Sequence, residues 1–419
     1  MAAKMTVTGP PRDILFCILS RLPLKAVVRC CCVSKFWNDV IKSPEFRHLH
    51  SSQSPTDPDP KLLFLSRRML RENVISISPM SLASYQLHIS DNSISNLVSS
   101  LAWNLVGACN GFLCFASADH ECVLVCNPIT KEFVTLPKSA RHSPLPPLVT
   151  TYGFGFDPAS QKYKVVRVFY SKEPSEDENA NQKVSAEVCT VGVAGCSWRP
   201  VPDFLQPPYG LPVYASGFVH WAVHPFFFGP ARIISFDLGK EESVLTHHPE
   251  FGLKFGIAEL GGCLSVVDLW KPTLIEIWVL KDRSSNDWEQ EYILPVGVPS
   301  GLDKRHSRLI TISEQDGVLL IWLQDAIFTY DRRTLSRKKM WIQGLPSWLD
   351  WEILCGYRPS LAPLRGDCER LGGESIDVAC FKSDLEICSR PAISSQIIDR
   401  SSGKCDGIVS CFVINQMLI

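Results

Sequence analysis

The chain has 419 residues, 45% of them hydrophobic and 20% charged, a composition that excludes a disordered, collagenous or coiled-coil protein. Its 42 basic and 43 acidic side chains leave a net charge of −1, without the basic excess that nucleic-acid-binding domains usually carry. No stretch approaches the roughly 18 apolar residues of a membrane span. We therefore expect no nucleic-acid and no membrane partner. The chain length predicts about two to three domains.

Residues 1–10 are expected to form a flexible N-terminus. The start of the chain lacks the apolar run of a secretory signal, so we expect an intracellular protein. The 17 cysteines are then interpreted as small buried hydrophobic residues of a reducing compartment, where disulfides are rare. The sequence predicts a protein of the cytoplasm, the nucleus or both, since no basic cluster decides between them.

Residues 11–50 predict a small unit of three helices. Its first helix carries one apolar stripe, formed by Ile14, Leu15, Ile18, Leu19 and Leu22. Pro23 ends that helix, Ser34 is placed to cap a third one, and Ser43-Pro44 is expected to end the third. A unit of this size buries little core by itself, so we expect it to need a partner surface.

The rest of the chain divides into a linker, a β region and a tail. Residues 51–60 hold only polar residues and prolines, which is typical of a linker. Short runs rich in Val, Ile and aromatic residues fill residues 61–364 and predict β-strands. Residues 365–419 show no sustained period, and the sequence leaves the order of this C-terminal tail open.

A weak internal repeat runs through the β region. Its copies begin at turns that contain a glycine, namely Gly111, Gly155, Gly217, Gly262 and Gly317. Their spacing is roughly that of a four-stranded propeller blade, at about 40 to 50 residues with longer loops in some copies. Residues 61–100 together with 350–362 are expected to close a sixth copy. The predicted fold is therefore an α+β multidomain chain, with three helices followed by a mainly β propeller of about six blades.

Signatures of enzyme chemistry are missing from the sequence. It contains no G-x-S-x-G, P-loop, H-E-x-x-H or C-x-x-C motif. We therefore expect a non-catalytic chain without cofactor or metal. The sharpest candidate for binding a partner is the run Phe226, Phe227 and Phe228, on a predicted loop tip that is either folded down as a plug or exposed.

Two alternative functions can be set against a binding role. An enzyme built on the propeller would need convergent side chains, and Asp237, Asp268 and Asp331 follow β runs in three repeats, although they fit turn positions better. A DNA-binding helix-turn-helix at 11–50 is disfavoured, because Arg29 and Lys35 are isolated and the second helix is rich in Cys and Val.

The helical segment resembles the F-box. The resemblance rests on Pro11-Arg12-Asp13-Ile14-Leu15, Ile18-Leu19, Leu22-Pro23, Val33-Ser34-Lys35-x-Trp37 and Pro44-x-Phe46. One departure is Pro10, where the family usually has leucine. The β region resembles the F-box-associated, kelch-like domain of plant F-box proteins, through NGFLCF (110–115), CNPITKEFVTLP (126–137), YGFGFDPASQKYKVVRV (152–168), the segment with Gly217 and Trp221, and GYRPSLAPL (356–364).

This resemblance implies a substrate receptor of an SCF-type ubiquitin ligase. The F-box would dock on a Skp-family adaptor, and through it on a cullin and a RING subunit, while the β domain recruits an unidentified protein substrate. The implied adaptor contacts are Pro11, Ile14, Leu15, Ile18, Leu19, Leu22, Pro23, Leu24, Val33 and Trp37. The alternative for each is a place in the core of the helical unit. The chain would act by proximity, with a stand-alone binding module or a propeller-scaffold enzyme as the alternative.

Overall fold

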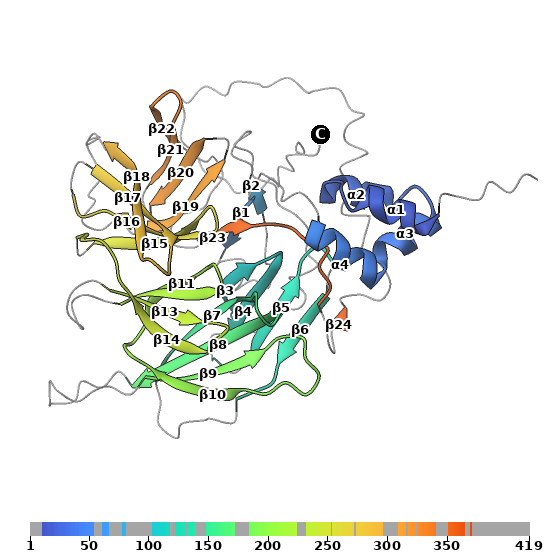
Figure 1. Cartoon of the computed structure of the whole chain (residues 1–419), viewed down its shortest axis with the longest axis horizontal. Helices are drawn as coiled ribbons and strands as arrows, with labels where there is room; N and C mark the ends of the chain where they lie inside the picture. Colours follow the sequence, from blue (N-terminus) through green and yellow to red (C-terminus); the bar gives the residue numbers. More distant parts are fainter. Residues whose placement is uncertain are drawn as a thin grey trace, which may run out of the picture.

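The computed structural model describes residues 11–53, 61–66, 78–80, 103–117, 120, 122–130, 132–139, 148–171, 184–223, 232–252, 254–271, 274–295, 309–315, 317–323, 326–340, 351–364 and 369–370. Within these ranges the helices come first in the chain and the strands follow (Figure 1).

The helical unit contains four helices, so the prediction of three was incomplete. They are α1 (Arg12–Leu19), α2 (Leu24–Cys30), α3 (Lys35–Lys42) and α4 (Pro44–Gln53). Ser34 caps α3 as predicted, since its Oγ accepts a hydrogen bond from the Trp37 amide at 3.2 Å. Helix α3 does end before Ser43-Pro44, but Pro44 begins another helix, because proline is well suited to a first helical position, where its missing N–H is no loss.

Apolar side chains from all four helices form the core of this unit. Buried members are Leu15, Leu19, Val27, Cys31, Val40, Ile41 and Phe46, and Phe16 packs edge-on against the Phe46 ring. One further buried member, Leu361, comes from the C-terminal end of the β region. The helical unit therefore completes its core with a residue more than 300 positions away in the sequence.

The described strands form six antiparallel sheets. Four have four strands each, in the orders β10-β9-β8-β7, β11-β12-β13-β14, β15-β16-β17-β18 and β19-β20-β21-β22, a fifth has the order β24-β6-β5-β4-β3, and a sixth has the order β2-β1-β23. The strands of the first three are β7 (Leu148–Asp157), β8 (Lys162–Ser171), β9 (Val184–Thr190), β10 (Arg199–Phe204), β11 (Tyr209–Ala215), β12 (Phe218–Val223), β13 (Arg232–Asp237), β14 (Glu242–Thr246), β15 (Phe255–Leu260), β16 (Cys263–Asp268), β17 (Leu274–Asp282) and β18 (Asp287–Pro295). Those of the others are β19 (Leu309–Gln315), β20 (Val318–Leu323), β21 (Ala326–Asp331), β22 (Ser336–Met340), β3 (Trp103–Cys109), β4 (Phe112–Ser117), β5 (Val123–Asn127), β6 (Glu132–Leu136), β24 (Glu369–Arg370), β1 (Lys61–Ser66), β2 (Ser78–Met80) and β23 (Trp351–Tyr357).

The sheets are joined through one edge strand each. Strand β3 contacts β7, β7 contacts β11, β11 contacts β15, β15 contacts β19, β19 contacts β23, and β23 contacts β3. In the last of these sheets, β23 pairs with β1 from the start of the β region, as predicted for residues 61–100 and 350–362. These contacts close a ring, which is consistent with the predicted propeller architecture.

Short turns of two kinds gather at one end of the ring, which we call the turn face. Two-residue hairpins at Asn110-Gly111, Ser216-Gly217 and Gly261-Gly262 have positive φ at both positions, as type I′ turns require. The second kind begins with Asp or Asn, whose side chain accepts hydrogen bonds from the amides two and three residues later, as Asp237 does from Gly239 and Lys240. Turns of neighbouring sheets touch, since the Ser216 hydroxyl donates to the Gly262 carbonyl at 3.0 Å.

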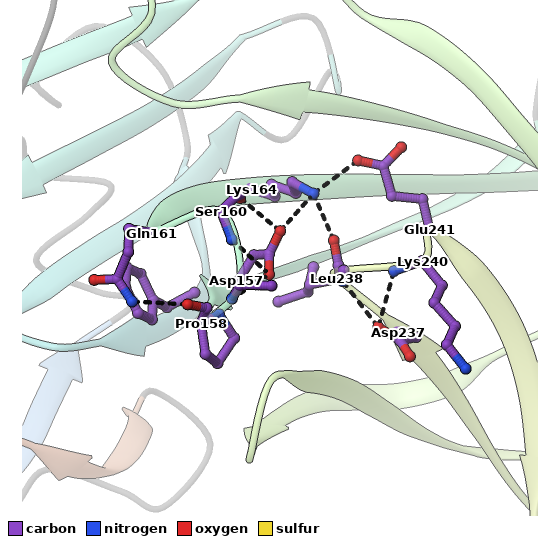
Figure 2. Close-up of polar contacts among 12 residues, drawn as sticks. Asp157, Pro158, Ser160, Gln161, Lys164, Asp237, Leu238, Lys240 and Glu241 are labelled. Carbon is purple, nitrogen blue, oxygen red and sulfur yellow. Dashed lines mark hydrogen bonds and ion pairs between the residues drawn. The ribbon is translucent and has the colours of Figure 1, made fainter.

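A buried ion-pair network also joins two sheets at the turn face (Figure 2). The Lys164 ammonium on β8 lies 3.0 Å from the Asp157 carboxylate and 2.8 Å from Glu241 in the β13–β14 turn. It also donates to the Leu238 carbonyl at 2.5 Å. Hydrogen bonds from Ser160, Lys164 and nearby amides lower the pKa of Asp157 to about 2 despite the opposing effect of burial. The network lies at the β7–β8 turn, which begins after Asp157. The predicted repeat-starting turn at Gly155 was therefore wrong, because Gly155 lies within β7.

Aromatic and aliphatic side chains fill the spaces between the sheets. Trp221 is fully buried, and Phe204 packs edge-on against it and stacks on Phe236. Of the eleven described cysteines, five are buried, four are half-buried, and Cys17 and Cys32 are exposed, so the interpretation of the cysteines as buried hydrophobic residues holds only in part. Burial raises the pKa of the Cys126 thiol to about 12, which keeps that thiol protonated and unreactive.

Candidate functional site

The helical unit exposes large apolar side chains that its own core leaves uncovered. They are Ile14 at 50% and Ile18 at 53% exposure on α1, Val33 at 62% before α3, and Phe36 at 44% on α3. Ile14 and Ile18 are one helical turn apart and so lie on one side of α1. We call these four residues the exposed apolar set. Exposed apolar side chains gathered on one small unit are typical of a protein-interaction surface.

The ten residues predicted as adaptor contacts divide into three groups. Pro11, Ile14, Ile18, Pro23 and Val33 are exposed, Leu22, Leu24 and Trp37 are half-buried, and Leu15 and Leu19 are buried in the core. The side chains of the last two hold the helices together and face no partner. Phe36 was missing from the prediction, although its position three residues after Val33 on the same run was a usable signal.

Charge also distinguishes the helical unit from the whole chain. Residues 11–53 contain seven Lys and Arg residues against three Asp and Glu residues, a balance of +4 that the chain total of −1 hides. One of the seven, Arg47, is paired inside the molecule with Glu132. Arg12, on the surface, lies 3.7 Å from Glu45. The net positive charge of this segment favours a partner with acidic side chains.

Helix α4 fixes the unit to the turn face of the ring. Its Arg47 guanidinium makes a bidentate pair with the Glu132 carboxylate, at 2.7 and 2.6 Å, next to the β5–β6 turn. The exposed apolar set, on α1 and around the start of α3, takes no part in this attachment, and Figure 1 places α4 nearest to the sheets. The ion pair that anchors the unit thus comes from α4, and Leu361 adds an apolar anchor in the helical core, while the exposed apolar set remains available.

The residues suspected of chemistry in the β region have structural roles instead. The side chains of Asp237, Asp268 and Asp331 each accept hydrogen bonds from nearby backbone amides, as expected of turn residues. His220 and Ser235 do form a hydrogen-bonded pair at 2.7 Å, but both are buried. Burial and the charge of Arg283 lower the pKa of His220 to about 3, so it remains neutral.

No cofactor or metal position emerges from the part of the chain that the structure describes. Among these residues, no three His, Cys, Asp or Glu side chains lie together in a way that could hold a metal ion. Nor does any described helix combine the length and hydropathy that a membrane span requires. The predicted binding residues Phe226, Phe227 and Phe228 lie outside the described residues.

Exposed apolar side chains of the β region lie partly at the end of the ring away from the turn face. Trp270 is 58% exposed and follows β16, on the connection to β17. Because neighbouring antiparallel strands run in opposite directions, this connection lies at the opposite end of the sheet from the β17–β18 turn. Tyr209 and Leu211 are exposed at the beginning of β11, again far from the β11–β12 turn. These residues offer a second apolar surface, remote from the helices.

Comparison with known proteins identifies both parts of the chain. Residues 11–49 match the F-box domain, and residues 56–354 match the F-box associated beta propeller domain. From Arabidopsis thaliana, F-box protein At3g07870 is 26% identical over 386 residues, covering 83% of this chain and 90% of that protein. F-box protein CPR1 is 26% identical, covering 82% and 87%, and F-box protein DOR is 26% identical, covering 68% and 76%. The chain therefore belongs to the F-box proteins that carry an F-box associated beta propeller domain, as its resemblance predicted.

Proposed function

We propose that this protein is the substrate-recognition subunit of an SCF-type ubiquitin ligase. The observation that carries the proposal is an F-box that exposes Ile14, Ile18, Val33 and Phe36 while Arg47 of α4 is anchored to the propeller. These four side chains, with Pro11 and Pro23 beside them, dock on a Skp-family adaptor. The adaptor links the chain to a cullin and a RING subunit.

The proposed scaffold for the substrate is a propeller of six blades. The ring of contacts through β3, β7, β11, β15, β19 and β23, and the pairing of β1 with β23, support this number. The substrate, a protein, binds at the end of the propeller opposite the turn face, where Trp270, Tyr209 and Leu211 are exposed. This places adaptor and substrate on different sides of the chain.

The mechanism requires no bond-making residue in this chain. An acceptor lysine of the substrate attacks the thioester between ubiquitin and an E2 enzyme, so that an amide bond forms and the E2 thiol leaves. The receptor contributes by holding that lysine near the E2, which raises the effective concentration of the reactants. We place this complex in the cytoplasm or the nucleus.

Co-purification with a Skp-family adaptor and a cullin tests the proposal. The informative variant is Ile18→Asp, because it puts a charge in the middle of the exposed apolar set without entering the core. The matched control is Leu335→Asp, an equally severe change at an exposed turn position of the propeller. We expect the parent and Leu335→Asp to retain both partners and Ile18→Asp to lose them. A folded parent chain that retains neither would refute the proposal.

A further inference from the structure

Arg47 uses its whole guanidinium at the junction between the F-box and the propeller. Besides the two bonds to Glu132, its Nε donates to the Leu361 carbonyl at 2.9 Å, and one Nη lies 3.5 Å from the Ala362 carbonyl. The side chains of Arg47 and Glu132 are only 4% and 2% exposed. A planar guanidinium that is hydrogen-bonded along several edges is held in one orientation. These bonds therefore restrict how α4, which carries Arg47, can lie on the propeller.

The partners of Arg47 belong to a segment that follows β23, residues 358–364, which we call the strap. The strap is also fixed to the sheet of β3 to β6, because the Asn127 amide donates to the carbonyls of Ser360 and Ala362 at 3.0 and 2.9 Å. The Leu364 amide donates to the same Glu132 carboxylate at 3.2 Å. The strap therefore lies between α4 and the β5–β6 turn and bonds to both.

Close packing leaves the strap little freedom to shift. Leu361 is fully buried among the helices, and Ile129 of the β5–β6 turn packs against the same cluster. On the turn face, a Cβ added at Gly111 would lie 2.5 Å from the Ser360 Cβ and 2.8 Å from the Ser360 amide nitrogen. The same strap also continues β23, the strand that closes the ring.

Three motifs that are far apart in the sequence meet at this junction. They are the Asn110-Gly111 turn, the Asn127 to Glu132 turn and the strap. The strap contacts both turns, and Arg47 of α4 bonds to Glu132 and to the strap. We propose that this junction locks the F-box in one orientation on the propeller, with Arg47 as the positioning residue that sets where the adaptor-bound E2 lies relative to the substrate. The effect on the position of the E2 rests on the proposed function, whereas the fixed orientation of the F-box on the propeller does not.

The geometry can be tested on the full chain with and without the adaptor. Two fluorophores are introduced through unnatural amino acids at Ser51, exposed on α4, and Gln290, exposed on β18, and single-molecule energy transfer gives the distribution of their distance. We expect one narrow distribution for the parent chain. In Arg47→Met it should broaden at least twofold, while the affinity for the adaptor changes by less than twofold. Arg47→Lys keeps the positive charge but cannot form the bidentate pair with Glu132. The width of its distance distribution should lie between those of the parent and Arg47→Met.

A second measurement follows ubiquitin itself. In a reconstituted ligase, the lysines of this chain that receive ubiquitin are identified by mass spectrometry. A fixed orientation should restrict modification to few lysines in the parent and in the control Arg21→Met, which changes an exposed arginine of the same unit. Arg47→Met should spread modification over more lysines. A structural role confined to stability would lower the total yield and leave the pattern unchanged.

The outcomes separate the inference from the proposed function. If Arg47→Met does not fold, the double variant Arg47→Met with Glu132→Leu replaces it, because removing both charges leaves no unpaired ion in the interior. A distance distribution as narrow as that of the parent in the folded variant overturns the inference. A parent chain that does not bind the adaptor overturns the proposed function, while the distance measurement on the chain alone still decides whether the junction is a lock.

Discussion

Two glycines with the same backbone conformation provide a sharp test of how the strap is held. Gly111 and Gly262 are both the second residue of a type I′ turn, and both have φ of +86°. Alanine at either position suffers the cost of a left-handed conformation, about 1–2 kcal/mol. The surroundings differ, since an added Cβ meets nothing within 4 Å at Gly262 but collides with Ser360 of the strap at Gly111.

The collision adds a second cost at Gly111 alone. Its closest atoms include the Ser360 amide nitrogen at 2.8 Å and the Arg358 carbonyl at 3.0 Å, so the backbone of the strap must move. Forced packing of this kind costs about 1–3 kcal/mol, which brings Gly111→Ala to a total of about 2–5 kcal/mol.

Urea denaturation followed by tryptophan fluorescence measures the free energy of unfolding of both variants. The cost of the left-handed conformation is common to the two variants and cancels when their free energies of unfolding are subtracted. The remaining difference measures the contact between position 111 and the strap. We expect Gly111→Ala to be the less stable by at least about 1 kcal/mol. In addition, its energy-transfer distribution between the F-box and the propeller should broaden, whereas that of Gly262→Ala should not. Equal losses of stability in the two variants would refute the contact between Gly111 and the strap.

Further predictions concern the propeller. Because the pKa of His220 is lowered to about 3, the unfolded chain binds a proton that the folded chain excludes, so stability should fall by about 1.4 kcal/mol per pH unit as the pH drops from about 6.5 towards 4. His220→Gln should remove this part of the pH dependence in denaturation curves, and an unchanged slope would contradict it. Trp221→Ala should cost about 3–5 kcal/mol, since the side chain is fully buried between sheets, and a loss below 1 kcal/mol in the same assay would count against that packing. Asp237→Ala should destabilise the β13–β14 turn while Asp237→Asn keeps its acceptor and stays near the parent; equal melting temperatures for the two variants would show that the turn bonds contribute nothing.

Local signals made much of the fold predictable. The Asn-Gly and Ser-Gly pairs identify hairpins because only certain residues accept positive φ at both turn positions. The capping role of Ser34 followed from its place before an apolar helical run. The helix that begins at Pro44 was missed for a related reason, since proline both ends one helix and begins another, and the residue pattern alone does not separate the two cases.

The candidate site was less accessible to sequence analysis. An apolar stripe such as Ile14 to Leu22 predicts a helix that buries one side, but it does not tell whether the burial is internal or against a partner. The structure divides the stripe, with Leu15 and Leu19 inside and Ile14 and Ile18 outside. The pair of Arg47 and Glu132 could not be anticipated, because no local pattern connects two residues that are 85 positions apart.

The most direct test of the proposed function is a calorimetric titration of the purified full chain with a purified Skp-family adaptor. We predict a one-to-one complex for the parent chain, with Leu335→Asp equal to it. Ile18→Asp should bind about a hundredfold more weakly, since burying an unpaired carboxylate in an apolar contact should cost more than the about 2.7 kcal/mol that this factor represents. Absence of binding by a folded parent chain, or equal affinities for the parent and Ile18→Asp, would contradict the account of the F-box given by this structure.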